Sequence, residues 1–309
     1  MIQNTNVGHY NIVVGDLKRK ADELIKKSVT AGSRKVYDAA LHKLTVFCQE
    51  RRIHKKDKFD PTTIECFVVD LHEKKLGCST IQTILSGLRH HCKANSIAIR
   101  FDTDRLKLVL QGIRKSDASS KRSRSTNHVT KAHLTKLCHA ADLLYCSNIA
   151  IMCKAIFCVA FFGLLRPCEM SRSKGAPQHQ LRRKNIKFTT NFLVFTFESF
   201  KHSVSGNVSV KVKKLPEADA FLCPWRNLYS YLSKNGSSDQ QPLFNISNSD
   251  LADMLQECCS AASIKSKLSL HSFRRGGATW YSFNGMPDAS LRALGRWSSN
   301  AYQVYVKAS

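Results

Sequence analysis

The sequence is poor in acidic residues and lacks the patterns that mark several large classes of protein. It has 23 Asp and Glu against 48 Lys and Arg over 309 residues, a formal net charge of +25. A surplus of this size is hard to explain unless the partner is a polyanion. Hydrophobic residues make up 43% of the chain, enough for an ordinary buried core, which excludes a disordered or fibrous protein.

Signals for export and for membrane insertion are also missing. Residues 1–14 do not combine a basic start, an apolar run and a small-residue cleavage site, as a secretory signal does. The most apolar stretch, residues 149–165, contains Lys154 and falls short of a bilayer-spanning length. We therefore expect a buried helix there, and a protein that stays inside the cell without a membrane partner.

The cysteine pattern lacks the spacings of metal and redox sites. The chain has 12 cysteines but no C-x-x-C pair, and the adjacent Cys258 and Cys259 do not have a metal-ligand spacing. Most cysteines have apolar neighbours, as Cys66, Cys138 and Cys168 do. We expect packed core thiols and no bound metal.

A change in composition predicts two domains joined by a flexible basic linker. Residues 116–130 are rich in serine and basic residues and have almost no large apolar side chains. The net charge is +10 before residue 116, +4 over residues 116–136 and +11 after them. Because every segment is positive, we expect the whole chain to contact the polyanion.

The first domain, residues 1–115, is predicted to contain four or five helices. Apolar residues recur at helical spacing on either side of a break at Ala31 and Gly32, and Pro61 opens a further helix. Ser79 is the expected N-cap of the next helix, after Gly77. A compact helical module with a basic outer surface follows from this pattern.

The second domain, residues 131–309, is predicted to be helical with one small sheet. Thr130 can cap its first helix. Residues 186–188, 193–197 and 207–212 are rich in β-branched and aromatic residues, with turn residues between them. Helices are expected near residues 225–232, 248–262, 272–283, 289–294 and 300–306. The fold class is thus mainly α with a small antiparallel β-meander.

Two motifs place arginines next to helix ends. Arg166 follows the apolar stretch, with Glu169 three residues further on. His271 and Arg274 are also three residues apart, at the start of a predicted helix, so both project from one helix face. His271 stands near the helix N-terminus, where anions are held. An arginine at a helix end is usually a surface residue, so neither motif is specific by itself.

Two further motifs supply a lysine and a tyrosine. Lys201 lies in the predicted turn after the second strand, and the tetrapeptide Leu-Gly-Arg-Trp occupies residues 294–297. Tyr305 follows eight residues after Trp297. Either motif alone would carry little information.

In this order the four motifs resemble the tyrosine recombinase (phage integrase) family, whose sites run Arg, Lys, His-x-x-Arg, His or Trp, and Tyr. Residues 163–169 match a Gly-Leu-Arg-x-x-Glu segment apart from one extra Leu. The resemblance runs from about residue 130 onwards, and the first domain looks like the family's core-binding module. It implies a SAM-like helical domain and an integrase-type catalytic domain that form a C-shaped clamp on double-stranded DNA.

Within the family, the ending Gly-Arg-Trp-x-Ser-x-x-Tyr-x-x-Tyr is most similar to recombinases of eukaryotic mobile elements of the Crypton and DIRS types. This similarity implies DNA recombination or integration in the nucleus, by a homo-tetramer on synapsed DNA. Many family members continue after the tyrosine into a segment that docks on a neighbouring subunit, whereas four residues follow Tyr305 here. The mode of assembly is left open.

The resemblance implies a role for each group that handles protons. Tyr305 would be the nucleophile that forms a 3′-phosphotyrosyl link and frees a 5′-hydroxyl. Lys201 would protonate the 5′ oxygen as it leaves, its ammonium made more acidic by nearby arginines. His271 would accept the tyrosine proton or donate to a phosphate oxygen.

The remaining residues would stabilise charge on the phosphate. Negative charge grows on the non-bridging oxygens during attack, so the site needs fixed cations. Arg166 and Arg274 can each make bidentate bonds to phosphate oxygens, and the Trp297 indole would donate a hydrogen bond. Glu169 would orient the Arg166 region. No metal and no other cofactor is expected.

Several assignments stay open at this point. Tyr302 is a rival nucleophile on the same predicted helix as Tyr305, and the rivals of Lys201 are Lys187, Lys211 and Lys213. A type IB topoisomerase and a domesticated, non-catalytic DNA-binding protein are the alternative functions. The basic residues expected to contact DNA outside the site are Arg34, Lys35, Arg89, Lys93, Lys121, Arg122 and Arg124.

Overall fold

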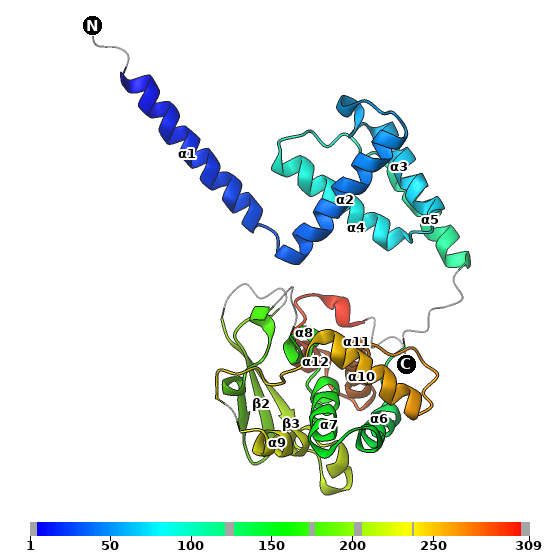
Figure 1. Ribbon diagram of the computed structural model, residues 1–309. Helices are drawn as coiled ribbons and strands as arrows, with labels where there is room; N and C mark the ends of the chain where they lie inside the picture. Colours follow the sequence, from blue (N-terminus) through cyan, green and yellow to red (C-terminus); the bar gives the residue numbers. More distant parts are fainter. Residues whose placement is uncertain (1–4, 121–126, 173–176, 201–205, 237, 304–309) are drawn as a thin grey trace. The chain divides into compact units, whose positions relative to one another are not determined.

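The computed structural model describes residues 5–120, 127–172, 177–200, 206–236 and 238–303 (Figure 1). The chain divides into an N-terminal unit, Met1–Arg124, and a C-terminal unit, Ser125–Ser309. The boundary falls within the segment that composition marks as a linker. Helix α5 (Asp104–Ser120) extends into that segment, beyond the residue where the linker is predicted to begin.

The N-terminal unit is helical. Besides α5 it contains α1 (Thr5–Lys27), α2 (Ala31–Glu50), α3 (Pro61–Glu73), α4 (Cys78–Ala94) and a short 3-10 helix, Lys55–Asp57. Helices α2 to α5 enclose a core that includes Leu44, Ile64, Phe67, Leu85 and Phe101. In α1, by contrast, Leu17 and Leu24 are exposed.

Two predicted helix boundaries in this unit are wrong. Helix α2 begins at Ala31, not after Gly32, because the Thr30 side chain accepts a hydrogen bond from the Ser33 backbone N–H and caps the helix. Helix α4 has Gly77 as its N-cap in place of Ser79, because the chain already turns at Gly77 and Ser79 lies inside the first turn.

The C-terminal unit surrounds one buried helix. Helix α7 (Ser147–Phe162) packs against α6 (Lys131–Leu144), α9 (Pro224–Lys234) and α11 (Leu270–Phe283). From Ala155 to Phe162 every residue is apolar and buried, which confirms the predicted buried helix over this part, whereas Ser147, Asn148 and Ile149 at its start are exposed. The unit also holds α8 (Pro167–Met170), α10 (Asn248–Ala261), α12 (Asp288–Gly295) and 3-10 helices at Pro177–His179, Arg183–Asn185, Glu217–Leu222 and Asn300–Tyr302. None of the helices in the described parts of the chain has the length and hydropathy needed to cross a bilayer.

A three-stranded antiparallel sheet lies beside these helices (Figure 1). Its strands are β1 (Ile186–Phe188), β2 (Phe192–Phe197) and β3 (Val208–Lys213), in the order β1-β2-β3. In the register, Phe195 pairs with Ile186 on one side and Val210 on the other. Alternate residues of β2 enter the core, as a half-buried strand requires. The predicted meander is confirmed.

The cysteines are mostly core residues, with exceptions. Nine of the twelve are buried, whereas Cys66 and Cys146 are exposed and Cys168 is half-buried. The prediction for Cys66 is wrong because the helical period turns it outward between the buried Ile64 and Phe67 of α3. Among the described residues, no group of His, Cys, Asp and Glu side chains could hold a metal ion.

Two glycines let α11 approach neighbouring backbone closely. A Cβ at Gly277 would lie 2.0 Å from the Phe161 carbonyl oxygen at the end of α7, and one at Gly276 would lie 1.8 Å from the Val129 carbonyl oxygen. Neither position can hold a side chain unless backbone moves. This close packing fixes the start of α11 against the end of α7, where the motif residues Arg274 and Arg166 are found.

We predict that Gly277→Ala lowers the free energy of unfolding of the C-terminal unit by about 3 kcal/mol, because the new methyl group must displace backbone. All three tryptophans lie in this unit, so fluorescence during urea denaturation reports on it. Gly236→Ala is the matched control: its Cβ would meet nothing within 4 Å, and we expect a change within about 0.5 kcal/mol. Equal stability of the two variants would contradict the close approach.

Candidate active site

The first motif forms a tight bend between α7 and α8. Leu164 adopts a left-handed conformation with φ 48°, and the extended Arg166 is the N-cap of α8, with Pro167 at the first helical position. The Arg166 backbone N–H donates to Glu169 Oε2 at 2.8 Å. The spacing of Arg166 and Glu169 in the sequence is therefore that of a capped helix start.

The Glu169 carboxylate is fully buried between two guanidinium groups. Arg166 Nη1 donates to Oε1 at 3.0 Å, and Arg296 Nη2 donates to Oε2 at 2.7 Å. A carboxylate removed from water is costly unless cations and hydrogen bonds replace the lost solvation. Here both oxygens are satisfied, in contact with Arg166 as the sequence predicts and with an arginine that it did not single out.

Arg296 is the residue that sequence reasoning missed. It follows α12 in a left-handed conformation with φ 55°, and its side chain is only 1% exposed. The guanidinium carbon lies 3.8 Å from the centre of the Phe197 ring, on β2. Burial lowers the pKa of Arg296 to about 10, with Glu169 opposing the shift, so the group remains charged at neutral pH.

Arg274 is also buried and is held by backbone carbonyls. It lies in the second turn of α11 and is 5% exposed. Its Nη1 donates to the Leu164 carbonyl and its Nη2 donates to the Gly295 carbonyl at 2.6 Å. The Leu164 carbonyl also accepts from Arg296 Nη2 at 3.4 Å. The structure thus brings Arg166, Arg274 and Arg296 together at the meeting point of three helix ends.

Trp297 completes one side of this cluster. The Arg274 guanidinium carbon lies 4.2 Å from the centre of the Trp297 ring, a cation–π contact that keeps the indole beside the arginines. Gly295 allows this placement, because a Cβ there would lie 1.8 Å from the ring. His271, one turn before Arg274, is exposed at the start of α11.

Tyr302, the tyrosine of the last motif that the structure describes, is buried and hydrogen-bonded. Tyr302 is 4% exposed, and its hydroxyl donates to Asp288 Oδ2 at 3.0 Å. Burial and this hydrogen bond raise the pKa of Tyr302. In this arrangement the Tyr302 hydroxyl is paired with Asp288 and its protonated form is favoured. Tyr305 lies outside the described residues.

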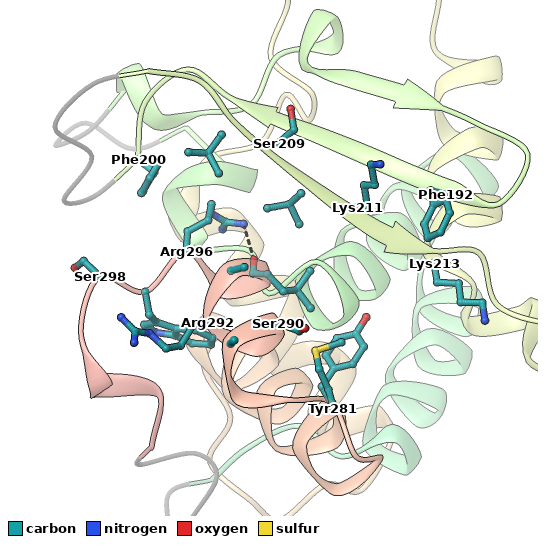
Figure 2. Close-up of a pocket in the computed structure, with 17 residues that line it drawn as sticks. Phe192, Phe200, Ser209, Lys211, Lys213, Tyr281, Ser290, Arg292, Arg296 and Ser298 are labelled. Atoms are coloured by element: carbon teal, nitrogen blue, oxygen red, sulfur yellow. Dashed lines mark hydrogen bonds between the residues drawn. The ribbon is translucent and has the colours of Figure 1, made fainter.

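Three of the four candidate lysines lie in the part of the chain that the structure describes. Lys201 lies outside the described residues, whereas Lys187, Lys211 and Lys213 are exposed on the strands. Lys211 and Lys213 line a cavity of about 930 Å³ between β3 and α12, which Arg296 and Trp297 also line (Figure 2). Lys211 and Lys213 on β3 thus border the same cavity as Arg296 and Trp297, which follow α12.

The residues expected to contact DNA elsewhere fall into three groups. Arg34, Lys35 and Lys93 are exposed on the N-terminal unit. Arg89 is half-buried, and its Nε and Nη2 donate to Asp102 Oδ1 at 2.8 and 2.7 Å, so its charge is already paired. Lys121, Arg122 and Arg124 lie outside the described residues.

Comparison with known proteins places this geometry in a known fold. Neither a scan against models of protein families nor a search of curated proteins gives a match. Among solved structures, the XerH site-specific recombinase bound to a palindromic difH substrate is similar with a TM-score of 0.64 and 14% identity, over 88% of this chain and 75% of that one. This chain has the tyrosine recombinase fold.

Two further structures with this fold support the assignment. The lambda integrase fragment bound to DNA has a TM-score of 0.58 and 13% identity, over 94% of each chain. The Tn1549 transposon integrase in complex with a circular intermediate DNA has a TM-score of 0.56 and 12% identity, over 89% of this chain and 94% of that one. The predicted fold class, mainly α with a small antiparallel meander, is confirmed.

We predict that Glu169→Gln destabilises the C-terminal unit by about 3–5 kcal/mol, because the buried Arg296 guanidinium then lacks its counter-charge. Thermal unfolding followed by near-UV circular dichroism measures the loss. Glu217→Gln is the control, since Glu217 pairs with Arg226 but is 80% exposed, and an exposed pair contributes at most about 1 kcal/mol. Similar losses in both variants would mean that Glu169 is not a buried structural charge.

Proposed function

We propose that the protein is a tyrosine recombinase that breaks and rejoins DNA through a 3′-phosphotyrosyl intermediate. The observation that carries this proposal is the cluster of Arg166 and Arg274, fixed side by side in a tyrosine recombinase fold, with Trp297 stacked on Arg274. A set of guanidinium groups held in fixed orientations suits the charge of a phosphodiester in its transition state. The net charge of +25 accords with a DNA partner.

In the proposed reaction the Tyr305 hydroxyl oxygen attacks the scissile phosphorus. A bond forms between phosphorus and the tyrosine oxygen while the bond to the 5′ oxygen breaks, and the energy of the phosphodiester is conserved for rejoining. His271 takes the tyrosine proton, and Lys201 gives a proton to the departing 5′ oxygen. The same groups act in reverse when another 5′-hydroxyl attacks the phosphotyrosine.

Arg166 and Arg274 neutralise the two non-bridging oxygens in this scheme, and the Trp297 N–H donates to one of them. Arginine suits this position better than lysine because its planar fork matches two phosphate oxygens at once. The reaction consumes no nucleotide and takes no electrons, so the chain's own residues suffice without a cofactor.

The biological setting is also part of the proposal. Exchange of both strands between two duplexes requires four cleavages, which favours a homo-tetramer on synapsed double-stranded DNA. The Gly-Arg-Trp ending supports a recombinase of Crypton or DIRS type, acting in the nucleus on a mobile element. Exposed Arg34, Lys35 and Lys93 would contact the DNA backbone.

We predict that wild-type protein becomes covalently trapped on suicide duplexes, whose nick near the scissile phosphate lets the short 5′-hydroxyl fragment dissociate. A pool with randomised sequence serves as substrate, and adducts are recovered under denaturing conditions and sequenced. Tyr305→Phe should abolish the adduct because it removes the attacking oxygen. Tyr302→Phe should retain it and lose only about 1 kcal/mol of stability, the contribution of one hydrogen bond.

Three outcomes would contradict this assignment. Absence of any wild-type adduct would favour a non-catalytic DNA-binding protein, and adducts that survive Tyr305→Phe would refute the nucleophile. The sequenced target can also be placed in a supercoiled plasmid. If the protein only relaxes that plasmid and never joins the target to a second duplex, the result would favour the type IB topoisomerase.

A further inference from the structure

Arg296 has no role in the reaction proposed above, yet it is as deeply buried as Arg274, with 6% and 5% of the two residues exposed. Besides its bonds to Glu169 and Leu164, its Nη1 donates to the Leu294 carbonyl at 3.2 Å, a contact dashed in Figure 2. Its side chain is 1% exposed and lies against the Phe197 ring. The charge of Arg296 is met by the Glu169 carboxylate, whereas the hydrogen bonds of Arg274 to Leu164 and Gly295 end on neutral carbonyls. The proposed reaction therefore gives the phosphate contact to Arg274 and none to Arg296.

Arg296 instead contacts the surroundings of Arg166 at two points. Its guanidinium shares the Glu169 carboxylate with Arg166, at 2.7 Å and 3.0 Å respectively. Its own carbonyl accepts a hydrogen bond from Arg166 Nη2 at 3.3 Å. The side chain of Arg166 is 11% exposed, so it reaches the surface while Arg296 does not.

We propose that Arg296 is a positioning residue that, by neutralising the buried Glu169 carboxylate, leaves the Arg166 guanidinium available to the DNA phosphate. The proposal rests on the DNA cleavage reaction proposed above. Without Arg296, Glu169 has one guanidinium partner among its described contacts, and a buried carboxylate binds its remaining cation more strongly. Arg166 then turns inward into a closer pair, and the attacked phosphorus loses one of its two cations.

An arginine can make all the contacts seen at this position. A guanidinium can lie flat on Phe197 and still direct separate N–H groups to Glu169, Leu164 and Leu294, which one ammonium group cannot do. Lysine at this position would keep a positive charge beside the Glu169 carboxylate but lose the contact of the guanidinium with the Phe197 ring. The two features can therefore be separated by substitution.

The test compares wild-type protein with Arg296→Met and Arg296→Lys in single-turnover trapping on one suicide duplex selected from the randomised pool. The same duplex is also made with an uncharged methylphosphonate at the scissile position, which removes the charge that Arg166 neutralises. Arg296→Met keeps an apolar side chain against Phe197, and DNA affinity and unfolding of each variant are measured in parallel.

With the ordinary phosphate, we expect Arg296→Met to react about 100-fold more slowly than wild type, the size of effect produced by a displaced catalytic group. Arg296→Lys should react within about 5-fold of wild type, because the lysine ammonium group still neutralises the Glu169 carboxylate. With the methylphosphonate, wild type and Arg296→Met should differ by less than about 3-fold, since a neutral phosphorus centre does not need the missing cation.

Other results would overturn the inference. A rate for Arg296→Met equal to wild type on the phosphate duplex would show that Arg166 does not depend on Arg296. An equal loss on the phosphate and methylphosphonate duplexes would show a general structural defect in place of a charge effect. If wild-type protein forms no adduct on either duplex, the proposed cleavage reaction itself fails, and the role of Arg296 fails with it.

Discussion

A single buried carboxylate joins the elements that make up the candidate site. Glu169 belongs to α8, and its two oxygens receive hydrogen bonds from Arg166 at the start of that helix and from Arg296 at the end of α12. Burial of the carboxylate is stabilised by both donors, because a buried charge that loses a partner costs several kcal/mol. Two loops far apart in the sequence are therefore held at a fixed separation. The Leu164 carbonyl extends this link to α11, since it accepts from both Arg274 and Arg296.

The apolar packing beneath the site makes this polar arrangement possible. Helix α7 is fully buried from Ala155 to Phe162 and ends at the bend that carries Arg166, so the position of the bend follows from the core. Gly277 lets α11 approach the backbone of α7 closely enough for Arg274 to reach the same bend. Strand β2 contributes Phe197, whose ring provides a flat surface for the Arg296 guanidinium. The packing of the sheet and the helices thus fixes the distances between the charged groups of the site.

Much of this arrangement follows from local sequence, and the part that does not depends on distant partners. Segments rich in β-branched and aromatic residues predict the three strands, and one long apolar stretch predicts the buried helix. Both signals work because residues close together along the chain decide those features. Motif order indicates Arg166, Arg274 and Trp297. Arg296 escapes such reasoning because Glu169 is 127 residues earlier in the chain, and only folding brings them together. The predicted N-cap of α4 fails for a related reason: Gly77 takes that position, and the neighbouring Cys78 N–H donates to Asp117, 39 residues further along the chain.

The large positive charge of the chain consists of two physically different populations. Exposed groups such as Arg34, Lys35 and Lys93 face solvent, where salt screens interactions over about 8 Å at physiological ionic strength. Arg274 and Arg296 lie in dry surroundings with fixed partners, and salt cannot screen contacts from which ions and water are excluded. In the proposed reaction, encounter with DNA depends on the first population, whereas the second would contact the phosphate through Arg274 and hold Glu169 through Arg296. A net charge counts both populations alike, whereas burial distinguishes the clustered arginines from the exposed groups among the 48 basic residues.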